Sequence, residues 1–120
     1  MKKIVSSIFG LIIMGVSITS AAYPQNACVG KVSHVGIFSD GKLTVSNGNG
    51  VHYLCNISTE TNGVSIEVCK NWHAIALAAY AANKDLAQFY NFGSEQSCST
   101  IGNWSVPNPV PYFINIGENS

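Results

Sequence analysis

The sequence predicts a small, mainly β domain with one α-helix, an α+β fold held together by two disulfides. Apolar and polar residues alternate in several short runs, which is typical of strands with one buried face. One alanine-rich segment contains no Gly or Pro and favours a helix. The four cysteines supply the cross-links that such a small hydrophobic core needs.

The start of the chain has the three parts of a secretory signal peptide. Lys2 and Lys3 form a charged start, residues 4–18 are an apolar run too short to span a bilayer, and small residues follow. We therefore expect residues 1–22 to be a signal peptide and residues 23–120 to be a single secreted domain. The compact signal indicates a bacterial protein that is periplasmic or extracellular and has no membrane span.

The secreted part predicts three strands, then a helix, then two strands. Asn71 can cap a helix that runs from Trp72 to about Asn83. The expected strands cover residues 29–38, 43–45, 51–57, 86–92 and 110–116, with turn signals at residues 40–41 and 47–50. This element order is that of an OB-fold, a small five-stranded Greek-key barrel, so we expect an OB-fold-like domain.

Export to an oxidising compartment favours disulfides over free thiols. Four cysteines allow three pairings. Cys55 and Cys69 flank a polar segment, so their bond would close a local loop and contribute about 3 kcal/mol in the chain-entropy model. Cys28 and Cys98 would then form the long-range pair. Because no CxxC motif is present, we expect no metal and no cofactor.

Charge and motifs exclude two broad classes of function. Residues 23–120 contain four lysines, six acidic residues and no arginine, so the net charge is −2. Such a chain lacks the basic surface that nucleic acid binding requires. The sequence also contains no GxSxG, HExxH or Walker-type motif, and we expect its three histidines to be packed or surface residues. We therefore expect a binding protein rather than an enzyme.

The residues best suited to a sugar are aromatic side chains beside neutral polar ones, because sugar rings stack on aromatic faces and their hydroxyls need neutral partners. Tyr90, Asn91, Trp104 and Tyr112 have this character. For Trp104 the structural alternative is that its ring covers one end of the barrel, and Tyr53 and Trp72 are expected in the core.

Several short motifs follow one another along the secreted part. They are Tyr53-Leu54-Cys55, a Gly/Ser-containing loop at residues 63–65, Cys69, Trp72 at the start of the helix, Gln88-Phe89-Tyr90, and the Trp- and Pro-bearing segment 104–111. Their order resembles the binding (B) subunits of the subtilase cytotoxin and pertussis-like toxin family. The positions of Cys28 and Cys98 depart from the family's pattern.

The resemblance implies a secreted, non-catalytic subunit that forms a ring of five, binds host-cell glycans and pairs with an exported A subunit. In that family the helices line the central pore, so the candidate subunit-interface residues are Trp72, Ala76, Ala79 and Tyr80. The family's first strand brings a serine to the sugar site, and Ser33 is the nearest, out-of-register candidate. The alternative function is a monomeric periplasmic domain that binds or inhibits another protein, as immunity proteins do.

Overall fold

The computed structural model describes residues 27–92 and 97–117, and the predicted signal peptide, residues 1–22, lies outside them. The described part is mainly β with one α-helix, as predicted. In chain order its elements are β1 (Ala27–Lys31), β2 (His34–Ile37), β3 (Lys42–Ser46), β4 (His52–Asn56), α2 (Ile66–Ala82), β5 (Asp85–Phe89), the 3₁₀ helix η1 (Cys98–Thr100) and β6 (Phe113–Ile116).

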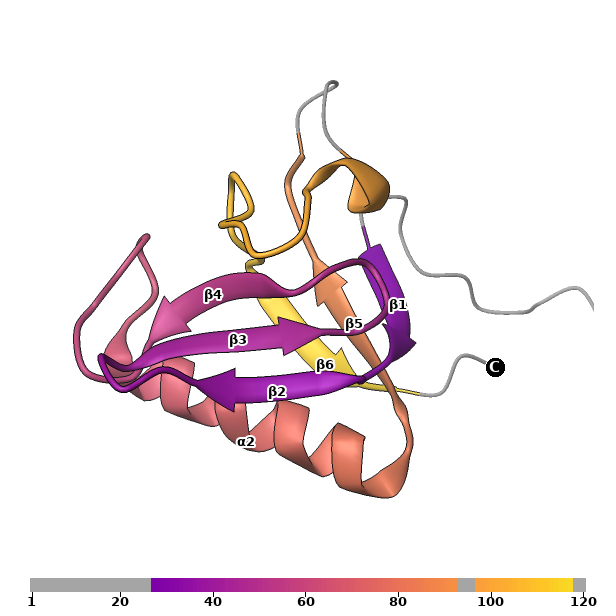
Figure 1. Cartoon of the computed structure of the whole chain (residues 1–120), viewed down its shortest axis with the longest axis horizontal. Helices are drawn as coiled ribbons and strands as arrows, with labels where there is room; N and C mark the ends of the chain where they lie inside the picture. Colours follow the sequence, from indigo (N-terminus) through magenta and orange to yellow (C-terminus); the bar gives the residue numbers. More distant parts are fainter. Residues whose placement is uncertain (1–26, 93–96, 118–120) are drawn as a thin grey trace, which may run out of the picture.

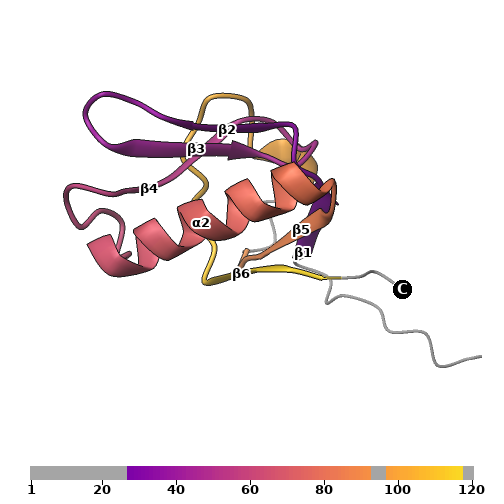
Figure 2. The ribbon, with the colours of Figure 1, turned by 90° about the horizontal axis from the view of Figure 1, so that it is seen from below.

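The strands form two antiparallel sheets of three, in the orders β1-β5-β6 and β2-β3-β4. Helix α2 contacts strands of both sheets and runs along the inner side of the β2-β3-β4 sheet (Figures 1 and 2). Within the described residues no ladder joins β4 to β6. The predicted five strands are six in the described residues, and they form two separate sheets rather than a closed barrel.

The extra strand arises because the run predicted as one strand, residues 29–38, is broken at Val32 and Ser33. β1 pairs with β5, whereas β2 pairs with β3, so the chain changes sheets at the break. Gly30 permits the close approach this needs, since a Cβ there would collide with the main chain of Asn47. The break carries no Gly or Pro at Val32 or Ser33, and apolar residues occur on both sides of it, so the sequence hides it.

Asn47 links the two sheets. Its side chain is 2% exposed, and its Nδ2 donates to the carbonyl oxygens of Cys28 at 2.9 Å and Leu86 at 3.0 Å. Asn49 Nδ2 in turn donates to Asn47 Oδ1 at 2.9 Å. The loop that follows β3 is thus bonded to β1 and β5 of the other sheet, which fixes the angle between the sheets.

Helix α2 begins six residues before the predicted start at Trp72. Ser65 is the N-cap, with its Oγ accepting from the Val68 N–H at 3.2 Å, and Glu67 lies in the positive first turn. Asn71 therefore lies inside the helix and does not cap it. The predicted end at Asn83 is confirmed, because this residue is the left-handed C-cap with φ 56°. None of the described helices is long and apolar enough to cross a membrane.

The two disulfides of the described chain are Cys28–Cys98 and Cys55–Cys69. The second closes a 14-residue separation and ties β4 to the first turn of α2, which supports the predicted contribution of about 3 kcal/mol. The main core lies between the two sheets and the helix. Its buried members include Leu43, Val45, Leu54, Val64, Cys69, Trp72, Ala76, Ala79, Leu86 and Ile114.

Candidate functional site

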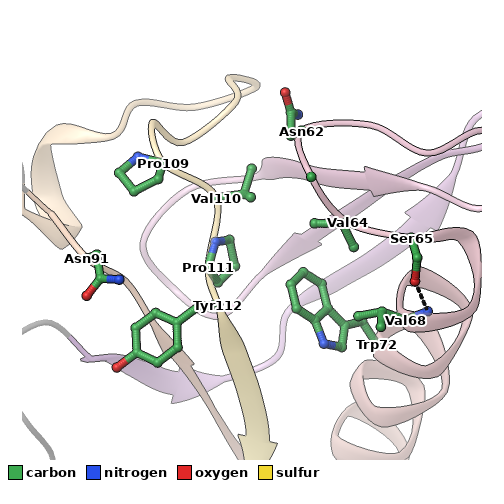
Figure 3. A pocket seen from close by; sticks show the side chains of 11 residues that line it. Asn62, Val64, Ser65, Val68, Trp72, Asn91, Pro109, Val110, Pro111 and Tyr112 are labelled. Carbon is green, nitrogen blue, oxygen red and sulfur yellow. Dashed lines mark hydrogen bonds between the residues drawn. The ribbon is translucent and has the colours of Figure 1, made fainter.

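The main candidate site is a pocket of about 470 Å³ at the start of α2 (Figure 3). The Pro109–Pro111 segment lies in the middle of the lining. In the view of Figure 3, Asn91 and Tyr112 lie on one side of it and Val64, Val68 and Trp72 lie on the other. Two of the residues predicted to bind a sugar, Asn91 and Tyr112, therefore lie in the same pocket although 21 positions separate them in the sequence.

Backbone bonds bring these two residues together. The Tyr112 N–H donates to the Phe89 carbonyl at 2.9 Å, which places the segment before β6 beside the end of β5. Pro109 and Pro111 keep this segment extended, because their φ angles are fixed and they cannot continue a helix. The chain after β5 and the chain before β6 thus form one wall of the pocket.

The opposite wall is a tight turn followed by the helix. Thr61 and Val64 exchange backbone hydrogen bonds of 3.3 and 3.0 Å, and the two residues between them have positive φ, 56° for Asn62 and 79° for Gly63. Asparagine and glycine are the residues that adopt this conformation most readily. The turn leaves Asn62 exposed at the rim of the pocket, and it ends at Val64, the residue before the Ser65 cap of α2.

The pocket is largely apolar, carries a few polar groups and has no charge. Its lining includes the carboxamides of Asn62 and Asn91 and the ring of Tyr112, whose residue is 59% exposed, and it includes no charged side chain. Carboxamides both donate and accept hydrogen bonds, and an exposed tyrosine offers an aromatic face. This combination suits a neutral ligand with rings and hydroxyl groups.

Three of the predicted sugar-binding residues lie outside this pocket: Tyr90, Ser33 and Trp104. Tyr90 is fully buried: its OH donates to Gln88 Oε1 at 3.3 Å and its ring stacks on Phe92 at 4.5 Å. Burial raises the pKa of this phenol. Tyr90 is therefore a core residue beside Cys28, and its prediction as a ligand contact is corrected. Ser33 is exposed, but it lies in the link between β1 and β2 and does not line the pocket.

Trp104, the remaining predicted residue, belongs to a second candidate surface, an aromatic cluster that we define as His34, Phe38, Tyr53 and Trp104. Its ring centroid lies 5.7 Å from that of His34, 6.4 Å from that of Phe38 and 6.2 Å from that of Tyr53. Trp104 is 49% exposed and Phe38 is 42% exposed. Tyr53, predicted to be a core residue, is only partly buried and joins this surface.

The backbone holds Trp104 in an uncommon conformation. Its φ is 57°, a region that costs a bulky residue of the order of 1–3 kcal/mol. The Trp104 N–H donates to the Val51 carbonyl at 2.6 Å, the Tyr53 N–H donates to the Ser105 carbonyl at 2.9 Å, and Asn103 Oδ1 accepts from the Val51 N–H at 2.8 Å. These bonds along β4 offset the strain and fix the position of the indole.

His52 is buried close to the same segment. Its residue is 1% exposed, and neither ring nitrogen has a hydrogen-bond partner among the described residues. Burial lowers the pKa of His52, and the nearby backbone of Gly102 and Asn49 opposes this shift. The ring is therefore a neutral packed group, in agreement with the sequence prediction for this histidine.

The predicted subunit-interface residues divide between core and surface. Trp72, Ala76 and Ala79 are 7%, 0% and 0% exposed and pack inside their own domain, so the structure corrects their assignment to a contact with a neighbouring subunit. Tyr80 is 56% exposed. Beside it Leu77 is 43% exposed, a residue that the prediction did not include.

Within residues 27–92 and 97–117, no three His, Cys, Asp or Glu side chains lie close enough together to hold a metal ion. The pocket lining supplies carboxamides, aromatic rings and the hydroxyls of Ser65 and Tyr112, but no thiol or imidazole. Comparisons with protein-family models, with curated proteins and with solved structures find no match to this chain.

Proposed function

We propose that this chain is a secreted, non-catalytic binding domain that recognises glycans through the pocket between α2 and β6. The observation that carries the proposal is the meeting of Asn91 and Tyr112 in an uncharged hollow of about 470 Å³. A sugar ring can stack on the exposed face of Tyr112 while its hydroxyls exchange hydrogen bonds with the neighbouring Asn91.

We further propose that the domain is an open relative of the OB-fold, as in toxin B subunits. If β1 and β2 are taken as one bent strand, this strand pairs with β3 on one side and with β5 on the other, and the remaining pairs are β3 with β4 and β5 with β6. This order supports a Greek-key barrel that is open between its third and fifth strands. The two disulfides support secretion or a periplasmic location.

A glycan array tests the binding proposal. The sample is the oxidised protein secreted from its full-length precursor, compared with its Tyr112→Ala and Asn91→Ala variants. Because a stacked ring and a neutral hydrogen bond each contribute about 1 kcal/mol, each variant should weaken binding about fivefold. Ile116→Ala is the control, since Ile116 is an exposed apolar residue of β6 that neither lines the pocket nor belongs to the proposed interface on α2. Equal loss in the control and in Tyr112→Ala would argue against the pocket.

Assembly into a ring of five, with an exported A subunit as partner, is the oligomeric part of the proposal. It is supported by the exposed part of α2, where no charged side chain occurs between Asn71 and Ala82 and where Leu77 and Tyr80 are uncovered. Light scattering after size exclusion measures the solution mass. A mass near five chains would support the ring, and a single-chain mass would refute it.

The same exposed helix surface favours the second candidate function, a monomeric periplasmic domain that binds or inhibits another protein. Here a partner protein, rather than another copy of the chain, would cover Leu77 and Tyr80. A single-chain mass, together with one protein that co-purifies in fixed proportion and is lost in a Leu77→Asp variant, would support this function. Glycan binding that requires Tyr112 would favour the first proposal.

A further inference from the structure

Three hollows in the surface share one residue, Asn62. The pocket at Tyr112 measures about 470 Å³, a hollow beside Asn108 measures about 210 Å³, and a hollow beside Tyr53 measures about 310 Å³. Every residue in the run 106–112 lines at least one of the three. The hollows therefore follow one continuous segment of chain.

Each end of this series carries an aromatic ring, which is exposed in Tyr112 and partly buried in Tyr53. Tyr112 lies at one end. Tyr53 lies at the other, with its ring centroid 6.2 Å from that of Trp104 and 5.7 Å from that of Phe38. Between the ends the lining offers carboxamide groups, including that of Asn62. A ligand that used both ends would be long, with ring-shaped units at intervals.

The wall formed by residues 106–112 cannot pair with a peptide as a β-strand would. Pro107, Pro109 and Pro111 have no N–H group, and the Tyr112 N–H already donates to the Phe89 carbonyl. Strand addition depends on a row of main-chain donors and acceptors. Recognition along this wall must therefore use side-chain carboxamides and ring faces, which suits sugars better than a peptide backbone.

The series is also close to electrically neutral. Among the described residues that line the three hollows, Lys42 is the one charged side chain. Its Nζ lies 3.2 Å from Asp40 Oδ2, so a neighbouring carboxylate already offsets its charge. An acidic ligand would find no unpaired cation along these hollows, whereas a neutral ligand needs none.

From these features we infer that the three hollows form one extended groove for a linear, neutral oligosaccharide of several sugar units, with Asn62 as its central contact. The inference rests on the proposed glycan-binding function and goes beyond it, because the pocket alone would accept a single terminal sugar. Asn62 joins the subsites: it lines all three hollows and is exposed at the tip of its turn.

The experiment measures how affinity depends on ligand length. Probes are neutral gluco-, manno- and N-acetylglucosamine oligosaccharides of one to six units, titrated by calorimetry into the oxidised protein secreted from its full-length precursor. The test variant is Asn62→Gly, because glycine accepts the φ of 56° and removes only the carboxamide. Asn83→Gly is the matched control, since Asn83 also has φ 56° but caps the far end of α2.

We expect the dissociation constant of at least one series to fall about tenfold or more between short and long members. Asn62→Gly should weaken the long probes about fivefold and leave the shortest binding probe within twofold, with no change in Asn83→Gly. Length-independent binding that still requires Tyr112 would overturn the groove and leave the proposed function standing. If no sugar binds, either in this titration or on the array, both the groove and the proposed glycan-binding function are overturned. Both are also overturned if an extended peptide is the one ligand whose binding requires Asn62.

Discussion

Removal of the Asn47 side chain should destabilise the fold strongly, because this residue bonds the two sheets to each other. Asn47→Ala deletes two buried hydrogen bonds, to the carbonyls of Cys28 and Leu86, and also the bond from Asn49. At about 1 kcal/mol for each bond, plus the penalty for buried carbonyls that lose a partner, the free energy of unfolding should fall by about 3 kcal/mol.

Urea denaturation of the oxidised protein, followed by circular dichroism, measures this difference. Asn56→Ala is the control: Asn56 makes two hydrogen bonds, to the Asp40 carbonyl and from the Ser58 N–H, but both are exposed. The control should lose less than about 1 kcal/mol. A loss below about 1 kcal/mol in Asn47→Ala, or equal losses in the two variants, would refute the role of Asn47 as the link between the sheets.

Three further predictions concern the buried histidine, the helix cap and the local disulfide. Burial lowers the pKa of His52 below its ordinary 6.5, so the unfolded chain binds a proton more readily than the folded one. The free energy of unfolding should therefore be full above pH 6.5 and fall as the pH drops below it. Urea denaturation at pH 8 and pH 5 should show a smaller loss of stability in His52→Gln than in the unchanged protein. Ser65→Ala removes the cap on the Val68 N–H and should cost about 1 kcal/mol in urea denaturation, whereas an unchanged midpoint would contradict the assigned start of α2. Replacing Cys55 and Cys69 together by alanine should cost about 3 kcal/mol in the same assay, and a loss near zero would contradict the loop-closure argument.

Much of the fold could be predicted because it depends on local pattern. Alternation of apolar residues predicted strands where β3 and β4 lie, although most residues of both strands are buried on either face. Asn83 was found as the end of the helix because capping is a short-range property. The pairing of Cys55 with Cys69 followed from the short segment between them. Each of these features is set by residues within about 15 positions of one another.

The failures have long-range causes. The break at Val32 and Ser33 depends on which strands lie beside β1 and β2, and neither β5 nor β3 can be seen from that segment alone. The earlier start of α2 was missed because Ile66 and Val68 are β-branched and disfavour a helix locally, whereas the Ser65 cap and the Cys55–Cys69 bond favour it. Tertiary contacts decided the first case, and in the second the local Ser65 cap together with the disulfide outweighed the low helix propensity of Ile66 and Val68.

For the candidate site, the types of residue suited to a sugar could be read from the sequence, but the positions of their side chains could not. Residue type alone selected Asn91, Tyr112 and Trp104, which are exposed, and also Tyr90, which is buried. Adjacent residues at a strand end point to opposite sides, so Tyr90 enters the core beside Cys28 and Asn91 turns outward to the pocket.

The aromatic cluster depended on a conformation that residue type does not reveal. A tryptophan at φ 57° is rare, and hydrogen bonds to β4 are what hold Trp104 there. Had the backbone taken the ordinary negative φ, the indole would point in another direction and would not meet Phe38 and Tyr53. The strained backbone at Trp104 therefore places the indole beside Tyr53, the aromatic residue that lines that end of the groove, so a change in the backbone near Trp104 should first loosen the packing of Tyr53.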